Sequence, residues 1–552
     1  MTSRVEPPAS SSPPPAADSA FAPLRERVFA ALWIATVIGN AGSFMRDVAS
    51  AWMATELGGS PLSVAMVQAA ATAPAFLLAL PAGVFADIID RRRLLLGIQL
   101  LMAAASLTLS LLAWSGALTL PLLVALTFVA GVGAALMGPV WQSIVPELVS
   151  RPQLKSAVAL NSLGVNISRS IGPALGGLLL ATLGAGATYL ADVSSYVFVI
   201  ATLLWWKRPA TADDGLAERF PGAFRAGLRY ARASSELRRT LLRAAMFFPF
   251  GAAIWALMPL VSRDLLGGDA GFYGMILGAV GAGAIGGAFV LPALRRRFDN
   301  DAILLGSALV VAPVMALLAM GPGRLGGLAL ALVVGAAWIA ALTTLSGTAQ
   351  GVLPNWVRGR GLAVYLTVFN GAMTAGSLGW GAVASGIGLR GALLAAAAGL
   401  VVSALIARRL PLPSGDDDLS PSNHWPEPAV AEAVAHDRGP VLVTIEYRVA
   451  PGDRASFRDA MARLAPVRRR DGAYAWGVSE DAADPERIVE WFMVESWAEH
   501  LRQHARASGF QADMQVAARR WHQGEAPPVV RHLIGLPPQD RRPPPTRAGD
   551  PK

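Results

Sequence analysis

Four charged side chains stand inside long apolar stretches of this sequence: Arg46, Asp47, Arg169 and Asp192. Each such charge costs about 2.5–3.5 kcal/mol at the centre of a lipid bilayer, so it normally faces a water-filled cavity or an opposite charge. A carboxyl group in a dry cavity can bind and release a proton near neutral pH. Asp47 is therefore the candidate proton carrier.

A structural ion pair is the alternative. Arg46 and Asp47 are sequence neighbours and cannot face each other ideally on a helix, so each is expected to need a further partner. Arg169 could bind an anionic substrate or neutralise Asp47 or Asp192, and Asp192 could lie near the outer surface. Asn161 and Asn166 are candidate polar groups of the same pathway, with hydrogen bonding between helices as the alternative.

Two short motifs concentrate residues of special type. "GVFADIIDRRR" (83–93) places two acids before three arginines. "SIGPALGG" (170–177) offers Gly172, Pro173, Gly176 and Gly177, where small residues allow helices to approach closely and the proline permits a bend.

The composition predicts that these residues belong to a membrane protein. Of 552 residues, 53% are hydrophobic and 15% charged, whereas soluble domains carry about 25% charged residues. The mean hydropathy is +0.45. Spans need about 20 apolar residues, and twelve stretches qualify: 28–56, 62–86, 94–114, 119–141, 155–183, 187–206, 238–262, 270–294, 301–320, 325–349, 360–386 and 390–408.

The basic residues indicate orientation. The turns after the second, fourth, sixth, eighth and tenth stretches hold Arg91–Arg93, Arg151 and Lys155, nine basic residues between 207 and 243, Arg295–Arg297, and Arg358 and Arg360. The opposite turns hold far fewer: Arg263, Arg324 and Arg390. By the positive-inside rule, the rich turns and both termini are cytoplasmic. This distribution accounts for the net charge of +9 without a nucleic-acid partner.

The chain contains an internal repeat. "QSIVPELV" (142–149) resembles "QGVLPNWV" (350–357), and "GVFADIIDRRR" aligns with "GAFVLPALRRR" (287–297). Both halves keep the arginines that topology requires. In the alignment, however, Leu291 and Leu294 stand at the positions of Asp87 and Asp90. The acids are therefore expected to have a separate role. Two sets of six spans joined by a basic loop are typical of transporters with parallel repeats.

A soluble domain is expected after the spans, because "VLVTIEYRV" (441–449) alternates like a half-buried strand. Strands near 441–449, 473–479, 487–494 and 528–534 and helices near 453–465 and 497–520 follow the ferredoxin-like order βαββαβ. The predicted parts are a tail (1–24), two six-helix halves (25–206 and 238–410), a cytoplasmic linker with an interfacial helix (207–237), a second linker (411–439), the α+β domain (440–536) and a tail (537–552).

Neither metal nor cofactor is expected. His500 and His504 are four residues apart, but Leu501 stands where a zinc metalloprotease motif has glutamate. A surface or dimer-interface helix is the preferred interpretation. There is no cysteine, which excludes disulfides and thiolate sites, and no phosphate-binding G-x-x-x-x-G-K-[ST] loop, which argues against ATP drive.

The first motif resembles the G-x-x-x-D-(x)-(x)-G-R-R signature of the major facilitator superfamily, with Gly83, Asp87, Arg91 and Arg92 matching and Asp90 in place of glycine. Asp90 and "VPELVSRPQLKSAVALN" (145–161) are similar to the branch of enterobactin-type siderophore exporters, macrolide-efflux proteins and transmembrane secretion effectors. "GPALGG" resembles the antiporter motif of exporters. The resemblance, over about 25–410, implies that Asp87 meets the start of the eleventh span near Arg360 and latches a cytoplasmic gate.

The C-terminal domain resembles the antibiotic-biosynthesis-monooxygenase-like dimeric α/β barrels through "VEWFMVESWAEHLRQHARASGFQA" (489–512). That resemblance implies a pocket with Trp497 and His504, but a regulatory or dimerising role is preferred. The expected protein is an all-α bundle of twelve transmembrane helices in two pseudo-repeats plus this domain, in the cell inner membrane. It is expected to be no enzyme but a proton-coupled exporter of a small hydrophobic or amphipathic molecule. The alternatives are a membrane-tethered monooxygenase-like enzyme and uptake.

Overall fold

The computed structural model describes residues 21–206, 220–354, 356–413, 425, 428, 430–432, 434–507 and 509–536; side chains at 80, 82–88, 220–226, 505, 510 and 511 lie outside this description. The chain divides into two compact units. The first contains residues 1–217, 240–348 and 363–412, and the second contains 218–239, 349–362 and 413–552.

Long helices build the first unit. They are α1 (Arg27–Glu56), α2 (Pro61–Ile88), α3 (Arg91–Trp114), α4 (Leu120–Leu148), α5 (Leu154–Trp205), α7 (Ser235–Leu260), α8 (Ala270–Arg295), α9 (Asn300–Ala319), α10 (Gly323–Gly351) and α11 (Arg358–Ala407). Among the described residues these ten helical segments are long and apolar enough to cross a membrane. The protein is therefore a multi-pass membrane protein of mostly helical fold.

The sequence predicts twelve spans where the described residues form ten long apolar helical segments, because two predicted pairs each fall within one segment. Helices α5 and α11 have 52 and 50 residues. A straight helix of 52 residues would be about 78 Å long, against a hydrocarbon core of about 30 Å. Gly184 (φ 81°, ψ 176°) and Gly388 (φ 82°, ψ 164°) interrupt them with a backbone conformation that favours glycine. Both glycines fall in the predicted breaks.

Aspartates start three of these helices. Asp90, Asp269 and Asp299 each accept a hydrogen bond from the backbone N–H three residues later, at 2.9, 2.8 and 2.7 Å, and so cap α3, α8 and α9. Such a side chain satisfies an N–H group that has no partner in the helix. Asp90 and Asp299 occupy equivalent places, since α3 and α9 each follow a helix that ends near arginines.

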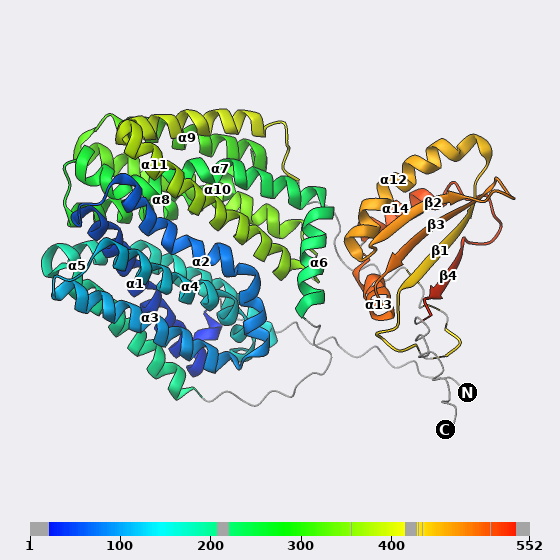
Figure 1. Cartoon of the computed structure of the whole chain (residues 1–552), viewed down its shortest axis with the longest axis horizontal. Coiled ribbons are helices and arrows are strands. Elements are labelled where there is room, and N and C mark those ends of the chain that lie inside the picture. The colour runs from blue at the N-terminus through cyan, green and yellow to red at the C-terminus, as the bar shows by residue number, and fades with distance from the viewer. Residues whose placement is uncertain are drawn as a thin grey trace, which may run out of the picture. The chain divides into compact units, whose positions relative to one another are not determined.

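The helices form two groups (Figure 1). Helices α1–α5 are drawn in blue to cyan, and α7–α11 in green to yellow. Within the first group α1 packs along α5, and α2 against α4, with Phe29, Leu95, Trp141 and Tyr196 in a shared core. Helix α5 also contacts α8, so it joins the two groups.

The second unit contains a four-stranded antiparallel sheet. Its elements are α6 (Phe220–Ala233), β1 (Val441–Arg448), α12 (Arg454–Asp471), β2 (Ala475–Glu480), β3 (Arg487–Val494), α13 (Trp497–Arg506), α14 (Gly509–Arg519) and β4 (Val529–Ile534). The strand order is β2-β3-β1-β4. This sheet is only loosely ferredoxin-like, and the predicted helix over 497–520 is divided into α13 and α14.

A buried ion pair lies inside this domain. Glu490 of β3 is fully buried and accepts hydrogen bonds from Arg468 at 2.9 Å and from Trp476 at 3.0 Å. The pair of Arg468 and Glu490 was not predicted from the sequence. Strand alternation could have found it, since Glu490 shares the inward face with Ile488 and Phe492.

Helix α6 contacts other parts of the second unit. Tyr230 donates a hydrogen bond to the Val352 carbonyl at 2.9 Å, and the Arg470 guanidinium lies 5.5 Å from the centre of the Tyr230 ring. Arg229 forms an ion pair with Glu499 of α13 at 2.9 Å. The part of α6 around Tyr230 is thus covered by protein.

We expect the contact between α6 and α13 to weaken in acid. Burial of Glu499 favours its neutral form, but Arg506 and Arg229 outweigh burial and hold the pKa of Glu499 below its ordinary value. A carboxylate with a lowered folded-state pKa stabilises the fold above its unfolded pKa of about 4.3, and this contribution is lost as pH falls through the folded pKa. Acid unfolding followed by tryptophan fluorescence should show this dependence reduced in Glu499→Gln and retained in the exposed control Glu495→Gln. Equal acid profiles would contradict it.

Candidate functional site

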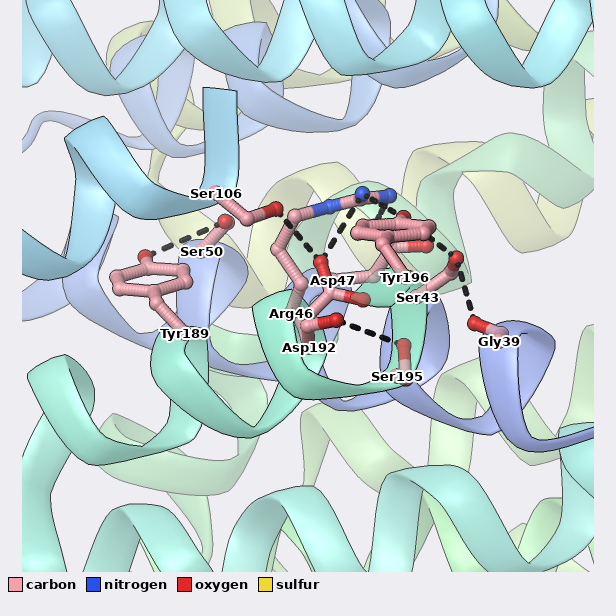
Figure 2. Close-up of polar contacts among 10 residues, drawn as sticks. All are labelled: Gly39, Ser43, Arg46, Asp47, Ser50, Ser106, Tyr189, Asp192, Ser195 and Tyr196. Atoms are coloured by element: carbon pink, nitrogen blue, oxygen red, sulfur yellow. Dashed lines mark hydrogen bonds and ion pairs between the residues drawn. The ribbon is translucent and has the colours of Figure 1, made fainter. Parts of the chain in front are cut away.

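A charged cluster lies where α1 crosses the second part of α5 (Figure 2). Arg46 is buried, and its Nη1 atom lies 3.3 Å from Asp192 Oδ2 and 2.8 Å from the Tyr196 hydroxyl. Its Nη2 atom lies 3.0 Å from Asp47 Oδ1. The long guanidinium therefore contacts both acids: Arg46 has the further partner that was expected, Asp192, and also pairs with its sequence neighbour Asp47.

Asp192 is the buried acid of the cluster. Its side chain has no exposed surface, and its Oδ2 atom also accepts a hydrogen bond from Ser106 of α3 at 2.6 Å. Three helices thus meet at this carboxylate. Its second oxygen, Oδ1, has no hydrogen-bond partner among the described residues. A buried carboxylate oxygen left in this way can accept a proton or a further donor.

Asp47 is the accessible acid. Its side chain is 47% exposed. The ring of Tyr273 in α8 stacks on Trp52, one turn further along α1, with ring centres 5.9 Å apart. Asp47 consequently lies close to the place where the two groups of helices meet.

The glycines of "GPALGG" bring α5 against its neighbours. A Cβ atom on Gly274 of α8 would lie 2.5 Å from Gly177 Cα, and one on Gly177 would overlap Gly274. One on Gly176 would lie 2.7 Å from the Met45 Cα of α1. Gly172 similarly faces Phe44, and Pro173 presents its carbonyl to Gly274. These contacts are between backbones, so they leave no room for a larger residue.

The other predicted pathway residues lie apart from the charged cluster. Asn166 is exposed and lies within about 20° of Gly177 around the axis of α5, on the face toward α8. Arg169 is exposed and forms no ion pair with any residue that the structure describes. Asn161 accepts a hydrogen bond from Trp141 of α4 at 2.8 Å, which favours its structural interpretation.

The predicted gating residues divide into several environments. Arg91 pairs with Glu147 of α4 at 2.5 Å, and Arg92 donates to the Leu203 carbonyl at the end of α5 at 2.8 Å. Gly83 and Asp87 lie in the last turns of α2, but their side chains are outside the described part. Arg360 belongs to the second unit, where it lies beside Gly227 of α6. The contact between Asp87 and Arg360 therefore stays a prediction.

Asp90 is expected to act as a helix cap. Loss of an N-cap costs about 1 kcal/mol, so Asp90→Ala should lower the melting temperature in detergent without changing the transport rate per folded molecule. Asp299→Ala, which removes the corresponding cap of α9, is the matched control and should behave alike. A large loss of transport in Asp90→Ala alone would instead assign Asp90 to the gate.

Sequence reasoning missed Ser106 and Tyr196 as partners of the cluster. Tyr196 follows Asp192 by four residues and so shares its helix face, a spacing that could have indicated the pair. Ser106 comes from α3 and carries no such signal. Neutral polar residues in apolar stretches are too common to single out a contact between distant helices.

An aromatic cluster occupies the second group of helices. Phe248 of α7 lies 4.6 Å from Phe369 of α11 and 5.7 Å from Trp338 of α10, measured between ring centres. Trp255 lies 5.3 Å from Trp338. The Trp255 Nε1 and Tyr365 hydroxyl groups are buried without hydrogen-bond partners among the described residues. This region combines packed aromatic rings with two buried donors that have no partner among the described residues.

Curated relatives match mainly the helical part of the chain. The "Staphyloferrin A transporter" of Staphylococcus aureus is 24% identical over 46% of this chain and 64% of its own length. "Macrolide efflux protein A" of Streptococcus pyogenes is 25% identical over 44% and 60%. These matches span less than two thirds of either relative. "Multidrug efflux pump Tap" of Mycolicibacterium fortuitum is 25% identical over 68% of this chain and 94% of that protein.

Solved structures support the fold. A bacterial homologue of the human lysosomal transporter Spinster, in an inward-facing and unoccupied conformation, superposes with a TM-score of 0.56. The two are 14% identical over 70% of this chain and 98% of that one. A transporter of the POT family in complex with a conjugated peptide also gives a TM-score of 0.56 at 14% identity, over 69% and 96%. The model of the transmembrane secretion effector family matches residues 18–539, and the chain belongs to this family of major facilitator transporters.

Proposed function

We propose that this chain exports a small hydrophobic or amphipathic molecule, such as a drug or a siderophore-like metabolite, in exchange for protons. The observation that carries the proposal is the cluster of Arg46, Asp47 and Asp192. One positive and two negative charges sum to −1, so uptake of one proton makes the cluster neutral. A neutral cluster costs less to enclose in a dry bundle than a charged one.

Asp47 is the acid that takes up the proton in this proposal, because it is the exposed member. When Asp47 is neutral, Arg46 is left to pair with Asp192. When Asp47 is charged, it competes with Asp192 for the same guanidinium. Proton binding thus changes the contact between α1 and α5 close to α8.

Twelve spans in two six-helix repeats are part of the proposal, with α5 and α11 each counted as two spans divided at Gly184 and Gly388. Alternating access would then rock one half against the other. The positive-inside distribution supports cytoplasmic termini in the cell inner membrane.

The proposed resting conformation opens to the cytoplasm. Two contacts between the halves lie at helix ends that adjoin turns poor in basic residues. Arg263 donates to the Thr55 carbonyl at 2.6 Å, and Ser385 accepts from the Leu62 N–H at 3.1 Å. In the proposed orientation these ends are extracellular. These contacts close the extracellular side, and Asn166 is exposed further along α5, which supports an inward-open state. The gate is then proposed at the cytoplasmic side, at Asp87, Arg91, Arg92 and Arg360.

The aromatic cluster around Phe248 and Trp338 is the proposed substrate site. The names of the relatives mention macrolides, multiple drugs and staphyloferrin A, and we extend to this chain only the class of small amphipathic molecules. Apolar walls with a few polar groups suit such ligands. The Trp255 and Tyr365 donors would orient them.

The C-terminal domain is proposed to regulate transport rather than to catalyse a reaction. Its helix α13 contacts α6 through Glu499 and Arg229, and α6 joins the two halves in sequence. Edge strand β4 exposes Val529, Val530 and Leu533, which supports a homodimer formed through this domain.

Everted membrane vesicles test the proposal. Vesicles that contain the full chain should accumulate one or more members of a panel of macrolides, lipophilic dyes and siderophores when a pH gradient is imposed. Accumulation should collapse when the gradient is dissipated by nigericin. Accumulation driven by ATP alone, or release of an oxidised product by the chain, would support a different class of protein.

A further inference from the structure

Three of the six histidines of the chain gather in the C-terminal domain. They are His500 and His504 of α13 and His532 of β4, and one ring nitrogen from each lies within 4.8 Å of the others. The Nε2 atoms of His500 and His504 are 3.2 Å apart. The ring centres of His500 and His532 are 4.6 Å apart.

Two secondary-structure elements fix this arrangement. His500 and His504 share one face of α13, since residues four apart on a helix are neighbours, and Ser496 caps that helix by accepting from the Glu499 N–H at 3.3 Å. His532 is held by pairing of β4 with β1, where it lies opposite Val443. The third histidine therefore comes from the sheet, which is why the spacing of "HLRQH" alone gave no indication of a complete set.

The surroundings leave polar atoms without partners. His500 is 1% exposed, and its Nδ1 atom has no hydrogen-bond partner among the described residues; the same holds for both amide atoms of Gln503. A neutral imidazole carries the lone pair that binds metal ions. Ligating histidines usually hydrogen-bond through their second nitrogen, and Gln503 is the nearby group for that.

The nitrogen spacing is close to that of a metal site. Tetrahedral zinc with Zn–N bonds of about 2.0–2.1 Å places its ligand nitrogens about 3.3–3.4 Å apart. The pair His500–His504 already has this separation. The widest pair has to approach by about 1.4 Å, a shift within reach of side-chain rotation, since His504 and His532 are only partly buried.

We propose that His500, His504 and His532 bind one divalent transition-metal ion such as Zn²⁺, with a fourth position open to water. Three imidazoles suit zinc, copper, nickel and cobalt. The ion would join α13 to the edge strand β4. Because Glu499 on the same helix contacts Arg229 of α6, metal occupancy would also strengthen the docking of α6.

Metal titration of the full-length chain, purified in detergent with any histidine tag removed, tests this site. Zn²⁺ should bind with one equivalent per chain by calorimetry, and Co²⁺ should give the strong visible absorption of a tetrahedral site. His532→Asn should weaken Zn²⁺ binding at least tenfold. The exposed His436→Ala is the control and should bind as the parent does.

The melting temperature with and without Zn²⁺ tests the site even in variants that fold poorly. Zn²⁺ should raise the melting temperature of the parent and of His436→Ala, but not of His504→Asn, in which a half-buried ligand is lost. No binding of Zn²⁺ or Co²⁺ by the parent would overturn the proposal. Parental affinity in both His532→Asn and His504→Asn would overturn it as well.

Discussion

Gly177→Leu should reduce the transport rate at least fivefold while the protein still inserts and folds. A Cβ atom at this position overlaps the backbone of Gly274, which cannot rotate away as a side-chain tip would. Overpacking a tight contact costs about 1–3 kcal/mol, which shifts an equilibrium between two conformations about 5- to 150-fold. The conformation that keeps α5 against α8 is therefore disfavoured.

The reverse position provides an independent check. Gly274→Leu should have the same effect, because a Cβ there lies 2.5 Å from Gly177 Cα. Gly286→Leu, on the same helix α8 with no atom within 4 Å of its added Cβ, is the matched control and should transport like the parent. Initial rates in proteoliposomes, normalised to folded protein, measure the effect. Parental rates in Gly177→Leu would mean that α5 and α8 need not approach during transport.

Arg46→Gln should strongly destabilise the protein. It leaves Asp192 buried with no exposed surface and without its opposite charge. Removal of one partner from a buried ion pair typically costs about 3–5 kcal/mol. The melting temperature in detergent should therefore fall markedly, and proton-coupled transport should be lost.

The double variant Arg46→Gln/Asp192→Asn separates stability from function. Both buried charges are then absent, so much of the lost stability should return, whereas proton-coupled transport should not. Asp192→Asn alone leaves Arg46 paired with Asp47 and should be less destabilised than Arg46→Gln. A double variant no more stable than Arg46→Gln would show that the acid and the base do not act as a pair.

The helical fold could be predicted because its signals are local. Apolar stretches and breaks fix most helix boundaries within a few residues, as in α1 and α8. The breaks between the fifth and sixth stretches and between the last two were predicted from the sequence. In the structure Gly184 and Gly388 interrupt α5 and α11 at these places with a non-helical backbone conformation that hydropathy does not encode.

The site was predictable only in part. The cost of charge in lipid selects Arg46, Asp47, Arg169 and Asp192 from sequence alone. The structure brings Arg46, Asp47 and Asp192 together, and Arg169 lies apart from them. Their burial was not predictable, since exposure depends on which neighbouring helix covers each side chain. The capping role of Asp90 is local and could have been predicted. It was missed because Asp90 aligns with Leu294 in the repeat, whereas the residue that caps α9, Asp299, lies at a different position of the alignment.

Proton exchange at Asp47 is the central claim, and flux in proteoliposomes with an imposed pH gradient tests it most directly. A transported drug or siderophore is loaded, and its gradient-driven movement is compared between the parent, Asp47→Asn and the control Glu56→Gln. Glu56 is another acid of α1, and it accepts a hydrogen bond from Trp52 Nε1 at 2.7 Å. The account predicts that Asp47→Asn loses gradient-driven transport but keeps slow downhill movement of substrate, while Glu56→Gln behaves like the parent. Gradient-driven transport at the parental rate in Asp47→Asn would contradict it.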